Sequence, residues 1–381
     1  MSNIKKIFFL LLGFIVFNIS NAKPISLAIS NDGKYAVSSN DDKNVYLYDL
    51  ESKTAKKVNT RRANPYSANF IDKSDDFIYQ DIDGIVYIVD AKTQKLIKKF
   101  NTGFKTQGPN NISTDLSIYV GSNDQGNIVI QQVKEKDPIK YTYGGKDQTI
   151  YSPYVPIFTP AQDKVIVTTS GGELWIFDIN EILKEDSAKH QVTIVENIGQ
   201  TMKDVDPTGK HVYAVDQQYS GIKYNLVTGE VSDKGFYYPK SVENVSYMLD
   251  GSKKTSFFKG LTNFKFIDND KIIATLKGVN QPYLLATIFS PNRFNWGQKK
   301  LVFYSDKYLP LVKAPLDTMF GNYQNDNEAY PITGGYNILF DTSVETHRLV
   351  MAQANGDGIM LYKYVPEIEE LSLEWVGDTP L

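Results

Sequence analysis

Short hydrophobic runs alternate along the whole chain with polar, turn-forming segments. Residues 25–59 contain the runs ISLAIS, YAVSS and VYLYDL, which are five or six residues long and rich in β-branched and aromatic side chains. Such runs are too short for helices and predict β-strands. Asn31-Asp32-Gly33 and the polar segment 39–44 favour tight turns between them. A fourth, more polar strand with lysines should follow, as expected at the outer edge of a sheet.

Comparable units recur along the rest of the chain. A turn after the first strand of a unit is predicted at eight positions, 40 to 51 residues apart: Asp32, Ser74, Thr114, Gln162, Thr208, Asp250, Pro291 and Thr342. A repeat length in the forties is typical of four-stranded propeller blades. We therefore predict an all-β fold, a β-propeller of eight blades with four antiparallel strands each. Seven blades is the alternative, in which the weakly matching sixth unit is an irregular insertion.

The ends of the repeat predict how the ring closes. The first unit begins with its inner strand and the last ends with its outer strand, so closure should depend on packing between the first and last blades. Residues 180–190 are predicted to form a short helix. The rival architecture, two β-sandwich domains, needs a central linker, but no Pro-, Ser- and Gly-rich stretch lies near residue 200. Residues 23–381 are therefore expected to form one propeller domain.

The first 22 residues follow a different pattern. Lys5 and Lys6 precede the apolar run IFFLLLGFIVF, and the small residues Ser20 and Ala22 follow it. These are the parts of a cleavable secretory signal, with cleavage expected after Ala22. A retained anchor is the rival, but a membrane span needs about 20 apolar residues. The sequence thus predicts a signal peptide over 1–22 and a periplasmic or secreted protein without a membrane span after cleavage.

Composition narrows the classes of function. The chain has no cysteine, which excludes disulfides, cysteine-linked lipid anchors and cysteine nucleophiles. A domain of this size can bury enough surface without such cross-links. The formal net charge is −3, and −5 without the first 22 residues, which leaves 39 basic against 44 acidic residues. Because the two signs are well mixed, neither nucleic acid nor an anionic membrane is an expected partner.

Third strands end in a recurring pair of residues. An aromatic or apolar residue is followed by aspartate at Tyr48-Asp49, Val89-Asp90 and Phe177-Asp178, and Asn225 takes the place of the aspartate in unit five. In this feature nearly all of the chain after the signal resembles WD40-like and YVTN-type bacterial β-propellers. The Gly-His pair of true WD40 repeats is missing and VYIVDAKTQKLIKKF is similar to the YVTN strand-turn-strand, so the YVTN type is the closer comparison. We interpret these aspartates as turn caps rather than catalytic groups.

Motifs for catalysis or metal binding are scarce. His190, His211 and His347 are far apart, and no HxxH, HExxH, GxSxG or GxxxxGK[ST] motif occurs. No cofactor is expected. Calcium is the least implausible metal because three turns are rich in oxygen ligands, but they lack the alternating pattern with a distal Glu and are interpreted as hairpin turns. These turns are Asn40-Asp41-Asp42, Asn123-Asp124 and Asn355-Gly356-Asp357.

Aromatic residues are frequent in segments predicted as loops, including Tyr141 and Tyr143. Tyrosine is common at protein contacts because it offers a rigid surface with one polar group, although rings can also pack between blades. The segment 310–335 is unusually long for a loop without a function. The candidate binding residues are Tyr151, Tyr154, Phe236, Tyr237, Tyr238, Phe320, Tyr323 and Tyr330.

Three functions follow from these observations. The leading one is an exported, monomeric, non-catalytic scaffold that binds a protein or an envelope polymer through aromatic loops on one face. The alternative is a periplasmic propeller hydrolase or lactonase with a divalent-cation site in the central channel. Resemblance to propeller enzymes implies such a site, assembled from carboxylates, Asn or His of several blades. A scaffold in outer-membrane protein assembly is a third hypothesis, based on analogy of fold.

Overall fold

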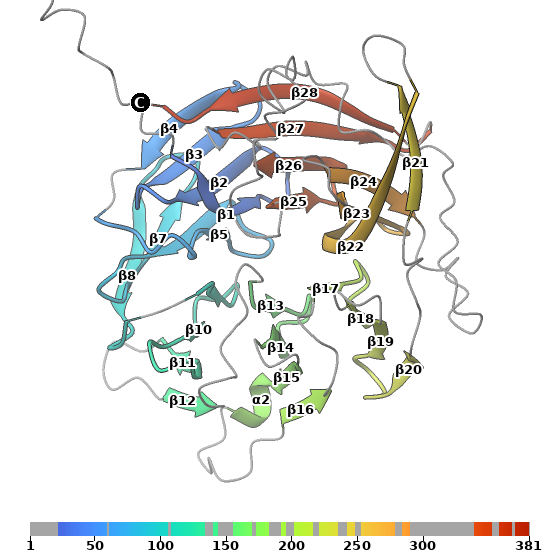
Figure 1. Ribbon diagram of the computed structural model, residues 1–381. Helices are drawn as coiled ribbons and strands as arrows, with labels where there is room; N and C mark the ends of the chain where they lie inside the picture. Colours follow the sequence, from blue (N-terminus) through green and yellow to red (C-terminus); the bar gives the residue numbers. More distant parts are fainter. Residues whose placement is uncertain are drawn as a thin grey trace, which may run out of the picture.

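The computed structural model places β-sheets around a central axis (Figure 1). It describes residues 22–58, 61–105, 108–133, 140–143, 155–169, 173–182, 192–195, 202–215, 221–234, 242–247, 253–278, 284–289, 339–352, 358–367 and 370–380. In this part of the chain there are seven four-stranded antiparallel sheets, and each is built from four strands consecutive in the sequence.

The sheets follow one another in chain order, each from its first to its fourth strand. The first three contain β1 (Pro24–Ile29), β2 (Tyr35–Asn40), β3 (Val45–Asp49) and β4 (Thr54–Val58); β5 (Asn69–Phe70), β6 (Asp76–Gln80), β7 (Ile85–Asp90) and β8 (Leu96–Asn101); and β9 (Asn111–Ile112), β10 (Ile118–Ser122), β11 (Ile128–Gln132) and β12 (Lys140–Tyr143). The next two contain β13 (Ile157–Phe158), β14 (Lys164–Thr168), β15 (Leu174–Asp178) and β16 (Val192–Val195); and β17 (Met202–Val205), β18 (His211–Val215), β19 (Gly221–Asn225) and β20 (Val231–Lys234). The last two contain β21 (Val242–Tyr247), β22 (Lys253–Asp268), β23 (Lys271–Gly278) and β24 (Leu284–Phe289); and β25 (Phe340–Ser343), β26 (Arg348–Ala352), β27 (Gly358–Val365) and β28 (Glu370–Asp378).

The turn between the first and second strands is repeated closely in four of the sheets. A backbone N–H there donates to the carbonyl three residues earlier, as from Gly33 to Ser30 at 2.9 Å. The donating residue has a positive φ in each, and it is Gly33, Leu116, Gln162 or Gly209. The predicted turns at Asp32, Ser74, Thr114, Gln162 and Thr208 all lie between the first and second strands of a sheet, which confirms the first five units.

The sheet of β21–β24 departs from this plan. β22 has 16 residues, and its first half pairs with β21 while its second half pairs with β23 through three register shifts. β22 also contacts β17 and β25, the first strands of the sheets on either side. Residues 263–268 therefore supply the inner strand, and the turn that follows them is Asn269-Asp270.

The predicted blade count needs correction. The sixth predicted turn, Asp250, and the seventh, Pro291, lie outside the described residues, and the eighth, Thr342, lies within β25 rather than in a turn. The described part of the chain has six regular blades and the irregular sheet β21–β24. Eight blades is therefore wrong, and so is the alternative of seven, although the described strands form seven sheets.

The hydrophobic core lies between neighbouring sheets. Alternate residues of β2 point to opposite sides, so that Val37 packs toward Phe70 and Phe77 of the second sheet, while Ala36 packs toward Val350 of the last. Buried clusters cover both faces of the first four sheets and of the last, and a strand covered on both faces reads as a continuous apolar run. This explains the runs that the sequence shows in the second and third strands.

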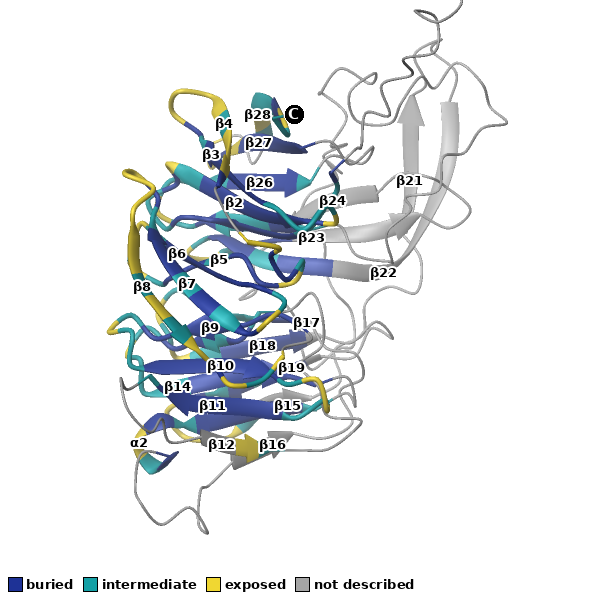
Figure 2. Cartoon of the chain, turned by 90° about the vertical axis from the view of Figure 1, so that its left-hand side faces the viewer, coloured by how far each residue is buried: buried dark blue, intermediate teal, exposed yellow. Residues whose placement is uncertain are grey.

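The outer strand of the first sheet is polar, as predicted. β4 and β8 are the last strands of their sheets and are largely exposed, as the yellow segments of Figure 2 show. Lys56 and Lys57 lie on β4, and Lys98 and Lys99 on β8. Charge on an open edge discourages pairing with a second copy.

Packing between the first and last sheets closes the ring, which confirms the prediction. β1 lies beside β25 and β26, and the sheets formed by the described strands share no strand. Leu27 and Ile29 of β1 form a buried cluster with Val350, Ile359 and Leu361 of the last sheet.

The described residues include only part of the predicted helix and almost none of the predicted signal peptide. The helix α2 (Ile179–Ile182) overlaps the start of the predicted helix, whose residues 183–190 lie outside the described chain. The described chain begins at Ala22, so the signal peptide stays a prediction. No helix in the described ranges has the length and apolar character to cross a membrane.

Candidate functional site

The eight aromatic candidates all fall outside the described residues, so their contacts stay predictions. They are Tyr151, Tyr154, Phe236, Tyr237, Tyr238, Phe320, Tyr323 and Tyr330. Tyr143, predicted to lie in a loop, instead ends strand β12. Its ring packs against the ring of Phe177 with centroids 4.9 Å apart, so this residue belongs to the core between two sheets.

The topology nevertheless relates the three aromatic segments to one another. Each joins the fourth strand of one sheet to the first strand of the next, as between β12 and β13, β20 and β21, and β24 and β25. In an antiparallel sheet of four strands, the fourth strand ends on the side where the first begins. The described ends that flank the first two of these segments therefore lie on one face of the ring, which we call the connection face. The third segment differs, because β24 ends level with Phe266, near the end of the inner strand, and the chain is back at the connection face only where β25 begins. The turns between first and second strands lie on the opposite face, the turn face.

On the turn face, turns from several sheets bind one another. The Asp72 carboxylate accepts hydrogen bonds from the Asn31 side-chain amide at 3.0 Å and from the Gln162 amide at 3.5 Å. The Thr114 hydroxyl donates to the Asp72 carbonyl at 3.1 Å, and its N–H donates to Gln162 Oε1 at 2.9 Å. Lys73 Nζ donates to the Pro160 carbonyl at 2.9 Å. We call Asn31, Asp72, Lys73, Thr114 and Gln162 the turn network.

The turn network ties together sheets that are not neighbours in the chain. Asp72 and Lys73 belong to the second sheet, whereas Gln162 and Pro160 belong to the fourth. These turns can meet only because they converge toward the axis of the ring. Within the network each donor faces an acceptor, and its single carboxylate already binds two amides. This arrangement is suited to fixing the turns in place rather than to proton transfer or cation binding.

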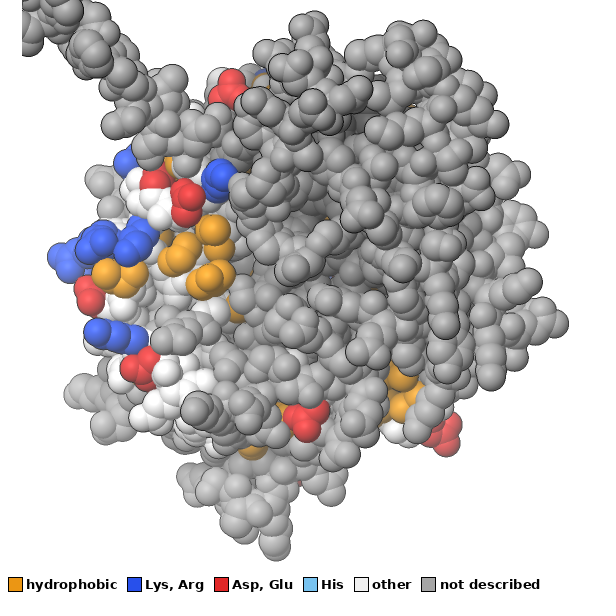
Figure 3. Space-filling model, in the orientation of Figure 1, with side chains coloured by type: hydrophobic (Ala, Val, Ile, Leu, Met, Phe, Trp, Pro, Cys, Tyr) orange, Lys and Arg blue, Asp and Glu red, His pale blue; other side chains and the backbone are white. Residues whose placement is uncertain are grey.

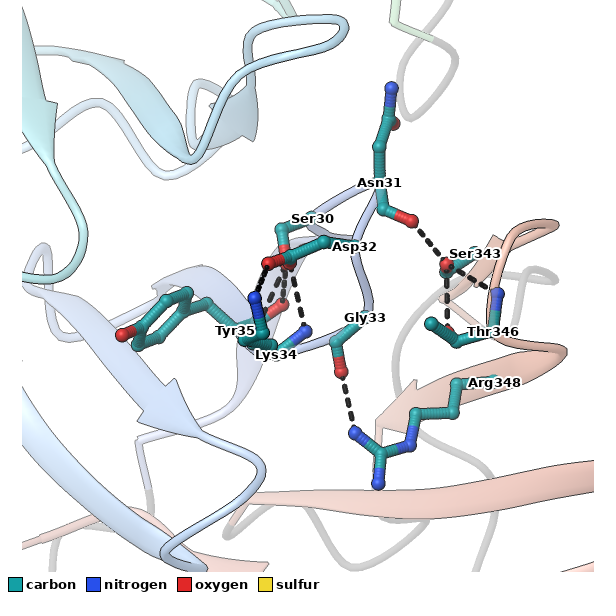
Figure 4. A network of polar contacts seen from close by, with 9 residues as sticks. All are labelled: Ser30, Asn31, Asp32, Gly33, Lys34, Tyr35, Ser343, Thr346 and Arg348. Carbon is teal, nitrogen blue, oxygen red and sulfur yellow. Dashed lines mark hydrogen bonds and ion pairs between the residues drawn. The ribbon is translucent and has the colours of Figure 1, made fainter.

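Polar contacts also join the first and last sheets on this face (Figure 4). Arg348 donates from a guanidinium N–H to the Gly33 carbonyl at 2.8 Å, and the Ser343 hydroxyl donates to the Asn31 carbonyl. Asp32 accepts from Ser30 Oγ at 2.8 Å and pairs with Lys34 Nζ at 2.6 Å. Partial burial opposes the charged form of Asp32, but these donors outweigh it and lower the pKa of the carboxyl group.

A second set of polar side chains binds the inner strands to one another. Asp204 Oδ2 accepts the N–H of Phe266 at 2.8 Å, Lys265 Nζ lies 3.4 Å from Asp341 Oδ1, and Asp341 Oδ2 accepts the N–H of Ile29 at 3.1 Å. We call Asp204, Lys265 and Asp341 the inner-strand clamp, because it connects the fifth, sixth, seventh and first sheets. Burial raises the pKa of Asp204. Burial opposes the charge of Lys265, but Asp341 and Asp204 outweigh it and raise the pKa of this lysine.

Lys203, beside the clamp, is a buried amine with only neutral partners. Its side chain is 3% exposed, and Nζ donates to the Val155 carbonyl at 3.0 Å and to Thr168 Oγ1 at 3.3 Å. Burial, with a smaller contribution from the charge of Lys265, lowers the pKa of Lys203 to about 7. Strongly shifted groups are common at functional sites but also occur in structural networks. The lack of exposure at Lys203 favours the structural role.

The aspartates at the ends of third strands cap turns, as predicted. Asp49 Oδ1 accepts the N–H groups of Glu51 and Ser52 at 3.1 and 2.8 Å. In the same way, Asp90 accepts a hydrogen bond from the N–H of Thr93, and Asp178 accepts one from the N–H of Glu181. Asn225 accepts hydrogen bonds from the N–H groups of Val227 and Thr228. Each side chain therefore satisfies backbone donors of the turn that follows it.

Two of the oxygen-rich turns are described, and both close hairpins. Asp42 accepts from the Asn44 backbone N–H at 3.0 Å and from Tyr46 OH at 2.6 Å, and Asn123 accepts from the N–H of Asn127 at 2.9 Å. The turn at 355–357 lies outside the described chain. Within the described ranges, no three acidic or histidine side chains gather as a metal site would require. His211 instead binds Asp206 at 2.8 Å.

The turn network and the inner-strand clamp were not predicted from the sequence. One signal for the network was present: Asn31, Asp72 and Thr114 occupy the same position in three successive turns. The clamp has a comparable signal, because Asp204 and Asp341 each lie two residues before the start of a turn, at Asp206 and Ser343. These positions become recognisable only after the repeats are aligned turn by turn.

Comparison with known proteins supports the fold. No family model matches the chain, and no curated protein matches it in sequence. Among solved structures, the Cps50 (Swd1) β-propeller domain of Myceliophteria thermophila superimposes with a TM-score of 0.54 at 11% identity, covering 87% of this chain and 93% of that one. Hsv2 of Kluyvelomyces marxianus gives 0.52 at 10% identity over 93% and 97%, and Hsv2 of Kluyveromyces lactis gives 0.53 at 12% over 94% and 100%.

These neighbours are WD40 β-propellers, and the chain shares their fold. Identities this low show the fold alone. The resemblance to the bacterial YVTN type is a separate matter and stays a prediction.

Proposed function

We propose that the protein is an exported, non-catalytic β-propeller scaffold that binds another protein or an envelope component through loops on its connection face. One observation carries the proposal: two of the three aromatic segments begin and end at this face, and the connection that holds the third ends there, at β25. A scaffold places its contact loops on a rigid support, and loops so placed commonly carry function. The turn network and the inner-strand clamp supply rigidity, because they tie sheets to one another on the opposite face and between the inner strands.

The main contact is assigned to residues 310–335, which hold Phe320, Tyr323 and Tyr330. Large aromatic side chains contribute most of the binding free energy at many protein interfaces. The triple variant F320S/Y323S/Y330S should keep its β-type circular dichroism and its melting temperature but lose its partner in affinity capture from an envelope extract. The matched control replaces polar residues of the same segment, Q324A/N325A/N327A, and should capture the partner normally. Unchanged capture by the aromatic variant would refute the assignment.

Export is tested separately. Cleavage after Ala22 would make Lys23 the first residue, and its nitrogen lies 2.9 Å from Asp41 Oδ1. The new α-ammonium group would thus meet a carboxylate. Fractionation of cells followed by N-terminal sequencing should find the protein outside the cytoplasm, beginning at Lys23. An intact Met1 in the cytoplasmic fraction would refute export while leaving the binding proposal open.

A further inference from the structure

The outer edge of the second sheet differs from a simple protective edge. β8 pairs with β7 and is the last strand of its sheet, so along the described chain its outward backbone groups face no further strand. Leu96 and Ile97 on this strand are 52% and 47% exposed. A register shift in the pairing with β7 leaves Ile97 without an opposite residue. Two consecutive large aliphatic side chains therefore lie at an open edge, where water contact is costly.

Lysines surround this aliphatic pair. Lys95 and Lys99 are exposed beside it, and Lys92 lies in the preceding turn. The acidic residue of this hairpin, Asp90, uses its carboxylate to bind the N–H and the hydroxyl of Thr93. In Figure 3, Lys and Arg side chains gather at the left margin of the molecule, where Figure 1 places β4 and β8. The edge is thus positive although the whole chain carries a net negative charge.

The outer strand of the first sheet, β4, is an example of an edge protected against pairing with another strand. β4 occupies the same place in the first sheet and carries exposed Lys56 and Lys57, but its apolar residues are less exposed: Ala55 is partly buried and Val58 is buried. Lysines with little exposed apolar surface are the usual protection of such an edge. The additional aliphatic pair on β8 calls for a different explanation.

We propose that the β8 edge, defined by Lys95, Leu96, Ile97 and Lys99, binds an acidic, extended polypeptide segment that adds a strand to the second sheet. The unpaired backbone groups would supply main-chain hydrogen bonds, and the aliphatic pair would contact apolar side chains of the segment. The lysines would repel a second copy of the same edge and attract acidic residues, which gives selectivity by charge. This inference rests on the proposed scaffold function and supplies it with a second contact for a protein partner.

The chemistry of the edge favours a polypeptide over other polyanions. A nucleic acid or an anionic polysaccharide would use only the amines and would leave Leu96 and Ile97 in water. A polypeptide strand can use the amines, the aliphatic pair and the backbone together.

The test measures peptide binding directly and needs no knowledge of the natural partner. A fluorescent peptide of alternating Glu and Val residues is titrated with the full chain at low salt, and a Lys/Val peptide and a single-stranded oligonucleotide of equal charge serve as comparisons. We expect the acidic peptide to bind at least about tenfold more tightly than either. K95E/K99E and L96S/I97S should each weaken its binding by at least about tenfold, whereas the control K56E/K57E on β4 should change it less than about twofold. Circular dichroism checks that each variant is folded.

The outcomes separate this inference from the proposed function. Equal binding of the oligonucleotide, or indifference to L96S/I97S, would overturn the β-strand contact. The protein could instead self-associate, with K95E/K99E increasing this self-association and the peptide not preventing it. That result would overturn the proposed peptide contact and would show that the β8 edge binds a second copy of the chain. Loss of partner capture by the aromatic triple variant with intact peptide binding would support both contacts. Capture that fails for every form of the protein, with peptide binding intact, would refute the scaffold function alone.

Discussion

Lys203 shows at the scale of one residue how the ring tolerates polar groups in its interior. Its ammonium group is buried between two sheets with a carbonyl and a hydroxyl as partners. Burial without a directly bound carboxylate disfavours the charged form, which is why its pKa falls to about 7. The folded protein therefore releases this proton at a pH where an unfolded lysine still holds it.

This shift predicts a rise in stability with pH. Between about pH 7 and the unfolded value of 10.5, the unfolded chain binds more protons at Lys203 than the folded chain, so the free energy of unfolding should increase as pH rises. A single group contributes at most about 1.4 kcal/mol per pH unit. Urea unfolding at several pH values, compared between the wild type and K203M, measures the contribution. The difference in stability between the two proteins should depend on pH above 7, and a constant difference would contradict the shifted pKa.

Gly33 leads to a second prediction at this scale. It has φ +66°, and a Cβ at this position would collide with the Thr346 side chain of the last sheet. G33A should therefore lower the free energy of unfolding by about 2–3 kcal/mol, because backbone strain and a steric clash add. Gly229 is the matched control: it has φ +75°, but a Cβ there would meet only Tyr224 Oη at 3.6 Å. G229A should lower the free energy of unfolding by about 1 kcal/mol. Equal losses for the two variants would show that small shifts of the Thr346 side chain remove the clash at position 33.

At the scale of the element, the turn caps determine how each hairpin is held. Asp49 accepts two backbone N–H groups after β3. D49A leaves both donors without this partner and should lower stability by about 0.5–1.5 kcal/mol. D49N keeps one side-chain oxygen as acceptor and should lose less. Thermal unfolding of the two variants checks the order, and an equal loss would indicate that the charge of Asp49, not its hydrogen bonds, matters.

The elements were predictable to the extent that each repeat carries its own local signal. Short β-branched and aromatic runs indicate the strands, and Asn31-Asp32-Gly33 and its counterparts indicate the first five turns correctly. The sixth unit contains both Asp250-Gly251 and Asn269-Asp270, and only contacts with neighbouring sheets decide that the second follows the inner strand. The turn predicted at Thr342 is wrong because β25 continues to Ser343 before its turn begins.

The candidate site was less predictable because its contacts are not local in the sequence. Hydrogen bonds such as Asn31 to Asp72 and Gln162 to Asp72 join residues from different repeats, and no local pattern records which turns converge. The lysines of the β8 edge are also visible in the sequence but are mixed there with acids. The fold separates them, because acids such as Asp90 serve as turn caps while lysines face outward on the last strand.

At the scale of the whole molecule, stability depends on contacts between sheets around the ring. Asp341 binds Lys265 of one neighbouring sheet and the N–H of Ile29 of the other, and so bridges the closure. D341A removes both partners and should lower the free energy of unfolding by about 1–3 kcal/mol. D341N keeps an acceptor for Ile29 and should lose less. Chemical denaturation measures both, and a D341A protein as stable as the wild type would show that the ring closes equally well without the contacts of Asp341.

Closure by packing has a consequence for biosynthesis. The ribosome makes β1 first and β28 last, yet Leu27 and Ile29 are covered only when Val350, Ile359 and Leu361 arrive. Contacts between the two ends of a chain are slow to form because the intervening loop is long. Until the final blade emerges, the nascent chain carries an uncovered apolar flank at its amino-terminal end, a feature that promotes aggregation and recruits chaperones. A premature stop codon before β25 would therefore leave an open arc with exposed apolar surface at both ends rather than a smaller ring.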